Sequence, residues 1–360
     1  MNEMWRGWAA RVVLALLCFV AAGQGARAND SASEFGLGGL VMVKMDAITM
    51  QREDLTITPN WVTVRYEFRN DGPAPVTLRV AFPLPEVPVF LPGRQMIGET
   101  KVDVFPFNPP NFVAFLAWVD GKAIAPEIEV RAELPDGRSV LDELREIGGW
   151  SLVLNPRMFA NRGRDEIDAL DIGPRMFRQL EEIGALGPRD ETSDGYGWAR
   201  WKTRITYHWE QTFRPGVTVV EHRYQPMAGF SMFRPDLRSW KDGPVDETVA
   251  ERHCIDDAAR RDLEGLQTPP GTPAAFEGWM TARTLAYVLT TGANWAGPIE
   301  TFKLVIDGSV GRHDWTTVRF AVGCVDLPLR RVGPTRLEAT ARNYIPTRDL
   351  WILLVTDARQ

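Results

Sequence analysis

Hydrophobic and polar residues alternate one by one along several stretches of the chain, most clearly at residues 61–69. Apolar side chains there point one way and polar side chains the other: Val62, Val64, Tyr66 and Phe68 against Thr63, Arg65, Glu67 and Arg69. A period of two predicts a strand with one buried face. The alternation resumes at 76–80 after the turn residues Asn70-Asp71-Gly72-Pro73, which predicts a hairpin that stops at Phe82-Pro83-Leu84-Pro85.

Two further hairpins are predicted. Asp120-Gly121 separates apolar stretches at 113–119 and 124–132, and Asp-Gly is a strong hairpin signal. Residues 201–213 and 217–224 alternate on either side of Arg214-Pro215-Gly216, and antiparallel pairing of these two strands is the simplest topology. Five more strands are predicted in the last third of the chain, at 279–290, 301–306, 315–322, 336–343 and 350–355.

Helical spacing replaces the alternation between residues 135 and 200. Ser139 is suited to cap a short helix that runs to Ile147. A second helix is predicted over 164–183, ending before Gly184, with an apolar stripe that docks on the sheet: Ile172, Met176, Leu180 and Ile183. Residues 246–266 are also predicted to be mainly helical, and a proline-rich connector follows at 268–273.

Short strands separated by turns, without regular βαβ alternation, favour antiparallel sandwiches over a doubly wound sheet. The sequence therefore predicts a mainly β fold with helical insertions, made of antiparallel β-sandwich-like units in two β-rich subdomains. The expected ranges are a cleaved signal peptide at 1–28, an N-terminal β-rich unit at 29–134, a helical insertion at 135–200, a β-hairpin that completes the N-terminal unit at 201–245, and a C-terminal helix plus β-rich unit with a disulfide at 246–360.

The first 28 residues have the three-part layout of a secretory signal peptide. Arg6 and Arg11 precede an apolar run of 11 residues at 12–22, and Ala26-Arg27-Ala28 precedes Asn29. A helix that spans a bilayer needs about 20 apolar residues, so cleavage is favoured over a retained anchor. Leu17 stands where a lipoprotein signal would have a small residue, which disfavours lipidation of Cys18. We expect a periplasmic or secreted protein that is not an integral membrane protein after cleavage.

Charge argues against a nucleic-acid partner. The chain has 41 basic and 47 acidic residues, and cleavage removes three arginines and one glutamate, which leaves a net charge of −8. An acidic surface repels phosphate backbones and anionic lipid headgroups.

Cleavage would also leave two cysteines, Cys254 and Cys324. In an oxidising compartment they are expected to form a disulfide, which closes a loop of about 70 residues and stabilises the fold by roughly 4 kcal/mol. The alternatives are a metal pair or two free thiols.

The common catalytic motifs are missing from the sequence. It contains no G-x-S-x-G elbow, H-E-x-x-H helix, P-loop, EF-hand loop or G-x-G-x-x-G fingerprint, and neither a cofactor nor a metal is predicted. His208 and His222 could approach each other across the third hairpin as a zinc or copper pair, or be ordinary strand residues. His253 beside Cys254 imitates a nucleophile cluster, but Asp256 and Asp257 fit better as acidic residues at a helix start.

Thirteen tryptophans raise the possibility of sugar recognition, although most are expected in the core. The most distinctive loop is the run from Thr290 to Ile299, which sets Asn294 and Trp295 among small residues between two strands. Asn294 and Trp295 form either a candidate recognition loop or a structural corner.

Several segments together resemble a bacterial family of exported proteins, domain of unknown function 4424. They span nearly the whole mature chain: Asn29-Asp30-Ser31, Gly38-Gly39-Leu40, the run from Val64 to Asn70, Phe82-Pro83-Leu84-Pro85, Cys254-Ile255-Asp256-Asp257 and the run from Gly292 to Pro298. The resemblance implies secretion past the inner membrane and supplies no catalytic residues.

The function predicted from the sequence is therefore non-enzymatic. We expect a binding or envelope-structural protein whose partner is another envelope protein or a glycan. The rival hypothesis is a hydrolase that acts on envelope polymers through paired carboxylates.

Overall fold

The computed structural model describes most of the chain after the predicted signal peptide. The described residues are 31–36, 39–85, 95–97, 100–101, 111–154, 174–187, 199–233, 249–266, 280–309 and 318–356. The predicted signal peptide at 1–28 and the connector at 268–273 lie outside them.

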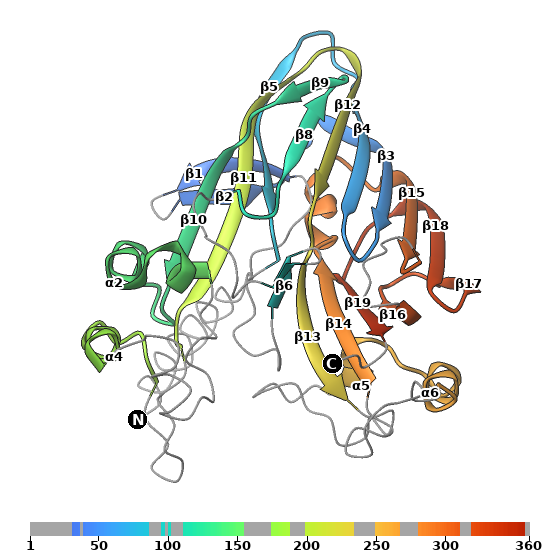
Figure 1. Cartoon of the computed structure of the whole chain (residues 1–360). Helices are drawn as coiled ribbons and strands as arrows, with labels where there is room; N and C mark the ends of the chain where they lie inside the picture. The colour runs from blue at the N-terminus through green and yellow to red at the C-terminus, as the bar shows by residue number, and fades with distance from the viewer. Residues whose placement is uncertain are drawn as a thin grey trace, which may run out of the picture.

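An eight-stranded sheet is the largest element of the fold (Figure 1). Its neighbours are antiparallel except for one parallel pair, β3 with β15. In spatial order the strands are β17 (Arg330–Gly333), β18 (Arg336–Tyr344), β15 (Ile299–Asp307), β3 (Ile48–Ile57), β4 (Val62–Asn70), β12 (Gly216–Tyr224), β8 (Leu116–Val119) and β9 (Lys122–Ile124).

Two smaller sheets complete the β structure. The five-stranded sheet has the order β10 (Glu127–Glu133), β11 (Lys202–Phe213), β5 (Val76–Pro83), β1 (Ser31–Gly36) and β2 (Gly39–Val43). The six-stranded sheet has the order β16 (Val318–Cys324), β19 (Leu350–Thr356), β14 (Met280–Tyr287), β13 (Met227–Phe233), β6 (Gln95–Ile97) and β7 (Thr100–Lys101). The mainly β, mainly antiparallel class predicted from the sequence is confirmed.

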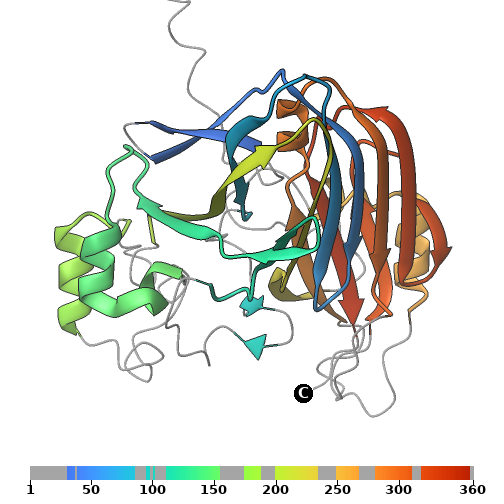
Figure 2. The same ribbon diagram turned by 90° about the horizontal axis from the view of Figure 1, so that it is seen from above.

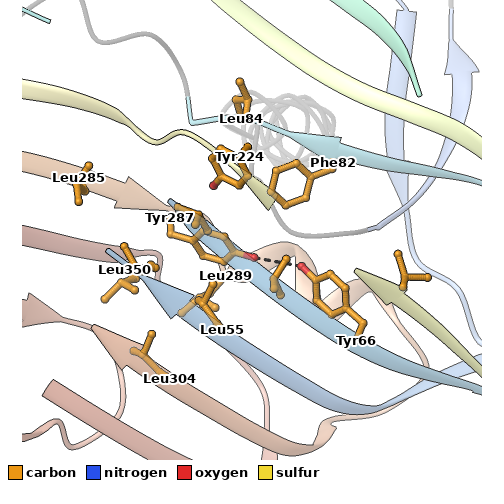
Figure 3. Packing of buried hydrophobic residues seen from close by; sticks show 14 of the residues in the cluster. Leu55, Tyr66, Phe82, Leu84, Tyr224, Leu285, Tyr287, Leu289, Leu304 and Leu350 are labelled. Atoms are coloured by element: carbon orange, nitrogen blue, oxygen red, sulfur yellow. Dashed lines mark hydrogen bonds between the residues drawn. The ribbon is translucent and has the colours of Figure 1, made fainter. Parts of the chain in front are cut away.

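One hydrophobic cluster joins the eight-stranded sheet to both smaller sheets. Phe82 of β5 and Leu285 of β14 belong to it, together with Leu55 of β3 (Figure 3). The hydroxyl oxygens of Tyr66 and Tyr287 lie 3.1 Å apart in this interior, so the cluster holds a polar link between two sheets. Paired hydroxyls can be buried at little cost because each satisfies the other.

The alternation in the sequence reports burial correctly. Val64, Tyr66 and Phe68 are fully buried in β4, whereas Arg65 and Glu67 lie on the outer face. The five strands predicted in the last third of the chain correspond to β14, β15, β16, β18 and β19.

Two predicted hairpins are wrong. β4 pairs with β3 and β12, while β5 pairs with β11 and β1 in another sheet. Likewise β11 and β12 belong to different sheets. The amide nitrogen of Asn70 donates to the carbonyl oxygens of Ala74 and Phe213, at 2.8 and 2.9 Å, which ties the turn after β4 to the end of β11. Both turns therefore carry the chain from one layer of the sandwich to the other. The alternation is the same in either case, because a strand can bury one face against any facing sheet, whichever strand lies beside it.

The hairpin at Asp120-Gly121 is confirmed, with Trp118 opposite Ala123. Both turn residues have positive φ, 47° and 75°, as a two-residue hairpin turn requires. Its second strand, β9, is short, and the chain continues into β10 of the five-stranded sheet.

Two helices pack beside one end of the five-stranded sheet (Figure 2). α2 (Leu141–Leu154) and α4 (Pro174–Glu182) bury Leu144, Phe177 and Leu180 in a cluster with β10 and Trp201. α2 is longer than predicted because it continues past a non-helical Gly149. α4 ends at Glu182, one residue before the predicted end, and Gly184 follows with a φ of 69°. Residues 164–173 of the predicted helix lie outside the described residues.

The predicted helical segment at 246–266 contains two short helices, α5 (Val249–Arg252) and α6 (Asp257–Glu264). Leu263 of α6 packs on Phe320 and Leu353, on the outer face of the six-stranded sheet. The Asp256 carboxylate caps α6 by accepting a hydrogen bond from the Ala259 backbone at 2.7 Å, as its position in the sequence suggested.

The sheets are continuous across residue 245, where the sequence placed a boundary between two β-rich units. β15 and β18 from the second unit share a sheet with β3 and β4 from the first. The division into independent units stays a prediction. The eight-stranded sheet includes strands from both predicted β-rich units.

Candidate functional site

A cleft of about 450 Å³ opens at one end of the eight-stranded sheet, beside the loop that the sequence singled out. We call it the loop cleft. It is lined by the start of β3, the start of β15, the end of β18 and the loop before β15: Thr49, Ala296, Gly297, Pro298, Glu300, Thr301, Arg342 and Asn343.

Trp295 anchors the wall of this cleft from inside the core. Its side chain is 1% exposed, and its ring centroid lies 4.5 Å from that of Phe68 and 6.0 Å from that of Phe213. A ring in that position cannot stack on a ligand at the surface. The structural-corner alternative therefore describes Trp295 better, while the residues that follow it line the cleft.

Backbone hydrogen bonds clamp the same loop to the segment that leads into β3. Met45 donates to the Asn294 carbonyl at 2.6 Å, and Ala296 donates to the Ile48 carbonyl at 2.9 Å. The 3-10 turn η5 (Thr290–Asn294) is fixed at its start because the Thr290 hydroxyl donates to Asp349 at 2.8 Å. Elements held from both sides keep a cleft in one shape before a ligand arrives.

The polar lining of the loop cleft combines two opposite charges with neutral donors and acceptors. Arg342 and Glu300 are exposed, and among the described residues neither forms an ion pair. Thr49 and Thr301 supply hydroxyl groups, and Asn343 supplies an amide from a backbone with φ of 52°. Such a lining can bind a small polar molecule through several hydrogen bonds.

The structure does not bring His208 and His222 together. Trp209, which follows His208 in β11, packs against His222 in the core, so His208 lies on the opposite face of its sheet. His222 is fully buried among aromatic rings: Tyr66, Phe82, Phe115 and Trp209 have centroids 5.1–5.7 Å from its own. Burial lowers the pKa of His222 to about 3. Burial also lowers the pKa of His208, against the opposing effect of Glu127. No group of three or more potential ligands that could hold a metal ion occurs within the described part of the chain.

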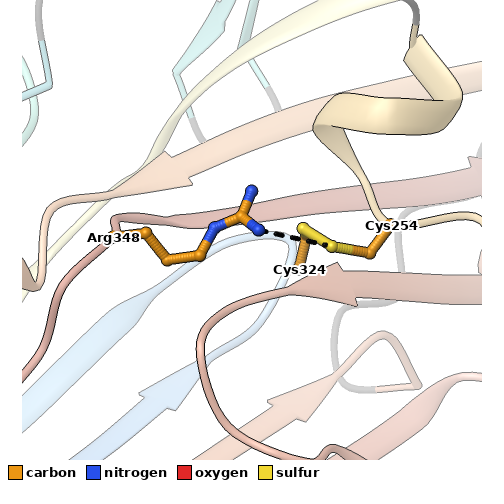
Figure 4. Close-up of a disulfide and its surroundings, with 3 residues drawn as sticks. All are labelled: Cys254, Cys324 and Arg348. Carbon is orange, nitrogen blue, oxygen red and sulfur yellow. Dashed lines mark hydrogen bonds between the residues drawn. A yellow bond between two sulfur atoms is a disulfide. The ribbon is translucent and has the colours of Figure 1, made fainter.

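Cys254 and Cys324 are joined in a disulfide, with Cα atoms 5.1 Å apart (Figure 4). It ties the segment between α5 and α6 to β16. Cys254 is exposed, and an Arg348 guanidinium nitrogen lies 3.7 Å from its sulfur. His253 is buried against Trp351, so the adjacent histidine and cysteine serve packing and cross-linking.

Among the described tryptophans, Trp201, Trp209 and Trp295 are buried. Four others, Trp61, Trp118, Trp150 and Trp351, are partly exposed. Three of these have an arginine over the ring: Arg223 on Trp61 at 3.9 Å, Arg145 on Trp150 at 4.8 Å and Arg252 on Trp351 at 5.2 Å. A guanidinium on the ring already occupies the surface that a sugar would use.

A second cleft of about 450 Å³ lies beside the bend of α2, between Asp142, Arg145, Glu146, Gly149 and Trp150. Arg145 is already engaged there, with Asp142 at 3.6 Å and with the Trp150 ring. We therefore prefer the loop cleft as the candidate site.

The sequence did not single out Arg342, Glu300 or Thr49. They come from three strands, and the parallel neighbours β3 and β15 are separated by more than 240 residues. No local motif links them. The only sequence feature near the cleft was the unusual loop at 290–299. The sequence singled out this loop for Asn294 and Trp295, and not for the residues that line the cleft.

The fold and the cleft define a β-sandwich protein with one large sheet, two smaller facing sheets and a preformed polar cleft at a sheet end. The chain belongs to the family called Domain of unknown function (DUF4424), whose family model matches residues 28–353. This confirms the resemblance seen in the sequence. Within the described residues, no helix is long and apolar enough to cross a membrane.

No curated protein shows a significant match to the chain. Among solved structures, the chain is similar to one from Legionella pneumophila described as a candidate nutrient binding protein, with 14% identity, 91% of this chain and 72% of that chain covered, and a TM-score of 0.36. It is also similar to an M1 zinc metallopeptidase from Deinococcus radiodurans, with 8% identity, 87% and 43% covered, and a TM-score of 0.26. At these identities and scores the likenesses identify no function.

Proposed function

We propose that this chain is an exported, non-catalytic binding protein of the bacterial cell envelope that takes a small polar ligand in the loop cleft. The observation that carries the proposal is the clamped cleft itself. A buried tryptophan and backbone hydrogen bonds on both sides hold the loop, while charged and polar side chains line the space beside it. The volume of about 450 Å³ lies within the range of small-molecule sites.

Export is supported by the layout of residues 1–28 and by the cysteine pair, since disulfides persist in oxidising compartments. We expect the protein purified from its native host to begin at Asn29 and to fractionate with the periplasm or the medium. Amino-terminal sequencing by mass spectrometry tests this. A purified chain that still begins at Met1 in the cytosolic fraction would contradict export.

Two carboxylates with shifted pKa values, Asp307 and Asp326, do not suit the general acid that the rival hydrolase needs. Burial raises the pKa of Asp307, but hydrogen bonds from Ser309 and Arg336 lower it further than burial raises it. Hydrogen bonds from Thr347 and Tyr344 lower the pKa of Asp326 in the same way, against the opposing effect of burial. A general acid needs a raised pKa to hold its proton at neutral pH, so these two groups are poor candidates for that role.

A bulky residue inside the loop cleft should abolish binding without unfolding the protein. We would screen sugars, amino acids and small organic acids for compounds that raise Tm, and repeat each hit with Thr301→Trp. The matched control is Thr340→Trp, because Thr340 is exposed on the adjacent strand β18, outside the cleft. A ligand at about 100 times its Kd stabilises by about 2.7 kcal/mol, which corresponds to about 4 °C for a protein of this size.

The expected result is a shift that Thr301→Trp removes and Thr340→Trp retains. A hit whose shift survives Thr301→Trp binds elsewhere and overturns the assignment of the cleft. Release of soluble fragments from envelope polymers by the wild type would favour the hydrolase instead.

A further inference from the structure

Arg342 differs from the other arginines of the eight-stranded sheet. Most of those pair with a carboxylate: Arg52 with Asp54, Arg65 with Glu67, Arg69 with Asp71, and both Arg330 and Arg336 with Glu338. Arg223 lies on the Trp61 ring, and Arg331 donates to backbone carbonyls. Within the described residues, Arg342 is the arginine of this sheet without such a partner, and it lines the loop cleft.

Glu300 is the acidic counterpart in the same cleft. It lies near enough to Arg69 to contribute to the raised pKa of that guanidinium, which is caused first by the hydrogen bond to Asp71. Glu300 forms no ion pair with Arg69 or with Arg342 among the described residues. Two opposite charges therefore face one space without neutralising each other.

Both charges line the same small cleft, which keeps them within reach of one small molecule. Thr301 of β15 is the Cα partner of Arg342 on β18, and Glu300 immediately precedes Thr301. Directly opposed residues on antiparallel strands lie about 5 Å apart. Thr301 lines the same cleft.

Charge balance selects the class of ligand. A simple anion would be attracted by Arg342 but repelled by Glu300. A simple cation would be attracted by Glu300 but repelled by Arg342. A neutral ligand would cover two charges without pairing either, which costs free energy because both lose water. A ligand with separated positive and negative ends pairs with both at once.

We propose that the loop cleft binds a zwitterion of amino-acid or short-peptide size, with its carboxylate on Arg342 and its ammonium group on Glu300. This inference rests on the proposed binding function of the same cleft. A guanidinium can hold a carboxylate through two parallel hydrogen bonds, which makes arginine suited to that end.

The test compares three probes that differ only at their ends. They are L-alanyl-L-alanine, its N-acetylated form, which lacks the positive end, and its C-amidated form, which lacks the negative end. Isothermal titration calorimetry with the wild type is expected to give the lowest Kd for the free dipeptide, with each blocked form weakened about 10- to 100-fold, since a hydrogen bond to a charged group accounts for a difference of that order.

Two charge-neutral variants assign the ends. Arg342→Gln should remove the preference for a free carboxylate and keep the preference for a free amine, and Glu300→Gln should do the reverse. Lys303→Gln is the matched control, because Lys303 is an exposed charge on β15 outside the cleft. It should leave all three Kd values unchanged.

Failure of this inference is distinguishable from failure of the proposed function. If none of the dipeptide probes binds while a sugar or an organic acid without an amine gives a Tm shift that Thr301→Trp removes, the cleft is a binding site and the zwitterion is wrong. Equal affinity for all three probes, or end preferences that persist in both Arg342→Gln and Glu300→Gln, would also overturn it.

Discussion

Acidification from pH 7 to pH 4.5 is expected to destabilise the fold by about 3 kcal/mol through His222 alone. The imidazole is fully buried among aromatic rings, and burial lowers its pKa from 6.5 to about 3. In the unfolded chain the same group takes up a proton near pH 6.5. Below that pH the proton therefore stabilises the unfolded state only.

The sign and window follow from these two values. Above pH 6.5 the histidine is neutral in both states and has no effect on the pH dependence. As the pH falls from 6.5 towards 3 the free energy of unfolding decreases, by about 4 kcal/mol in total, and the decrease stops once the folded state is protonated too.

The measurement is urea unfolding at pH 7.0 and 4.5 of the wild type and of His222→Phe, which keeps an aromatic ring in the cluster. The loss of stability between the two pH values should be smaller by about 3 kcal/mol in the variant. Tyr224→Phe is the matched control, because Tyr224 belongs to the same cluster and does not titrate in this window. An unchanged loss in His222→Phe would refute the assignment, since His208 and the carboxylates are present in all three proteins.

Removal of the disulfide is expected to destabilise the oxidised protein by about 4 kcal/mol. Cys254 and Cys324 are 70 residues apart, so the link restricts a long loop in the unfolded chain. In the folded chain the link fastens α5 and α6 to β16, where a small cluster around Ile255 and Leu263 provides the remaining attachment. The loss should therefore be concentrated in the helices and spare the eight-stranded sheet.

The variant for this test is Cys254→Ser with Cys324→Ala, because Cys324 is buried and a hydroxyl there would need a partner. Reductant should lower the Tm of the wild type to about that of the double variant and leave the variant unaffected. Hydrogen exchange should accelerate in α5 and α6 and remain slow in β3 and β4. Equal melting of the wild type with and without reductant would contradict a stabilising disulfide.

The cleft and the core are connected through Trp295. The same indole that packs on Phe68 and Phe213 fixes the loop whose next residues line the cleft. A ligand in the cleft would therefore contact a wall held by the hydrophobic core, which reduces the entropy lost on binding.

The sequence by itself determined many of the strands and which of their faces are buried, but it did not predict β1, β2, β3 or β13. Alternation at 62–69 marks Val64, Tyr66 and Phe68 as core because successive side chains on a strand point to opposite sides. Asp120-Gly121 determined a hairpin because few residue pairs adopt positive φ twice. The capping role of Asp256 and the end of α4 before Gly184 are local in the same sense.

Only the tertiary structure decided which strands are neighbours and where charges meet. Alternation indicates that a strand has an inner face but not which strand lies beside it. The pattern therefore predicts hairpins at the turns after β4 and β11, although both turns cross between layers. The parallel pairing of β3 with β15 brings Thr49 beside Glu300 and Arg342. The sequence left His222 open as a metal ligand or a strand residue and Trp295 as a recognition residue or a structural corner. Their burial depends on aromatic rings contributed by several strands. Contacts between residues far apart in the chain form only when the layers pack, and no local pattern of residue types encodes them.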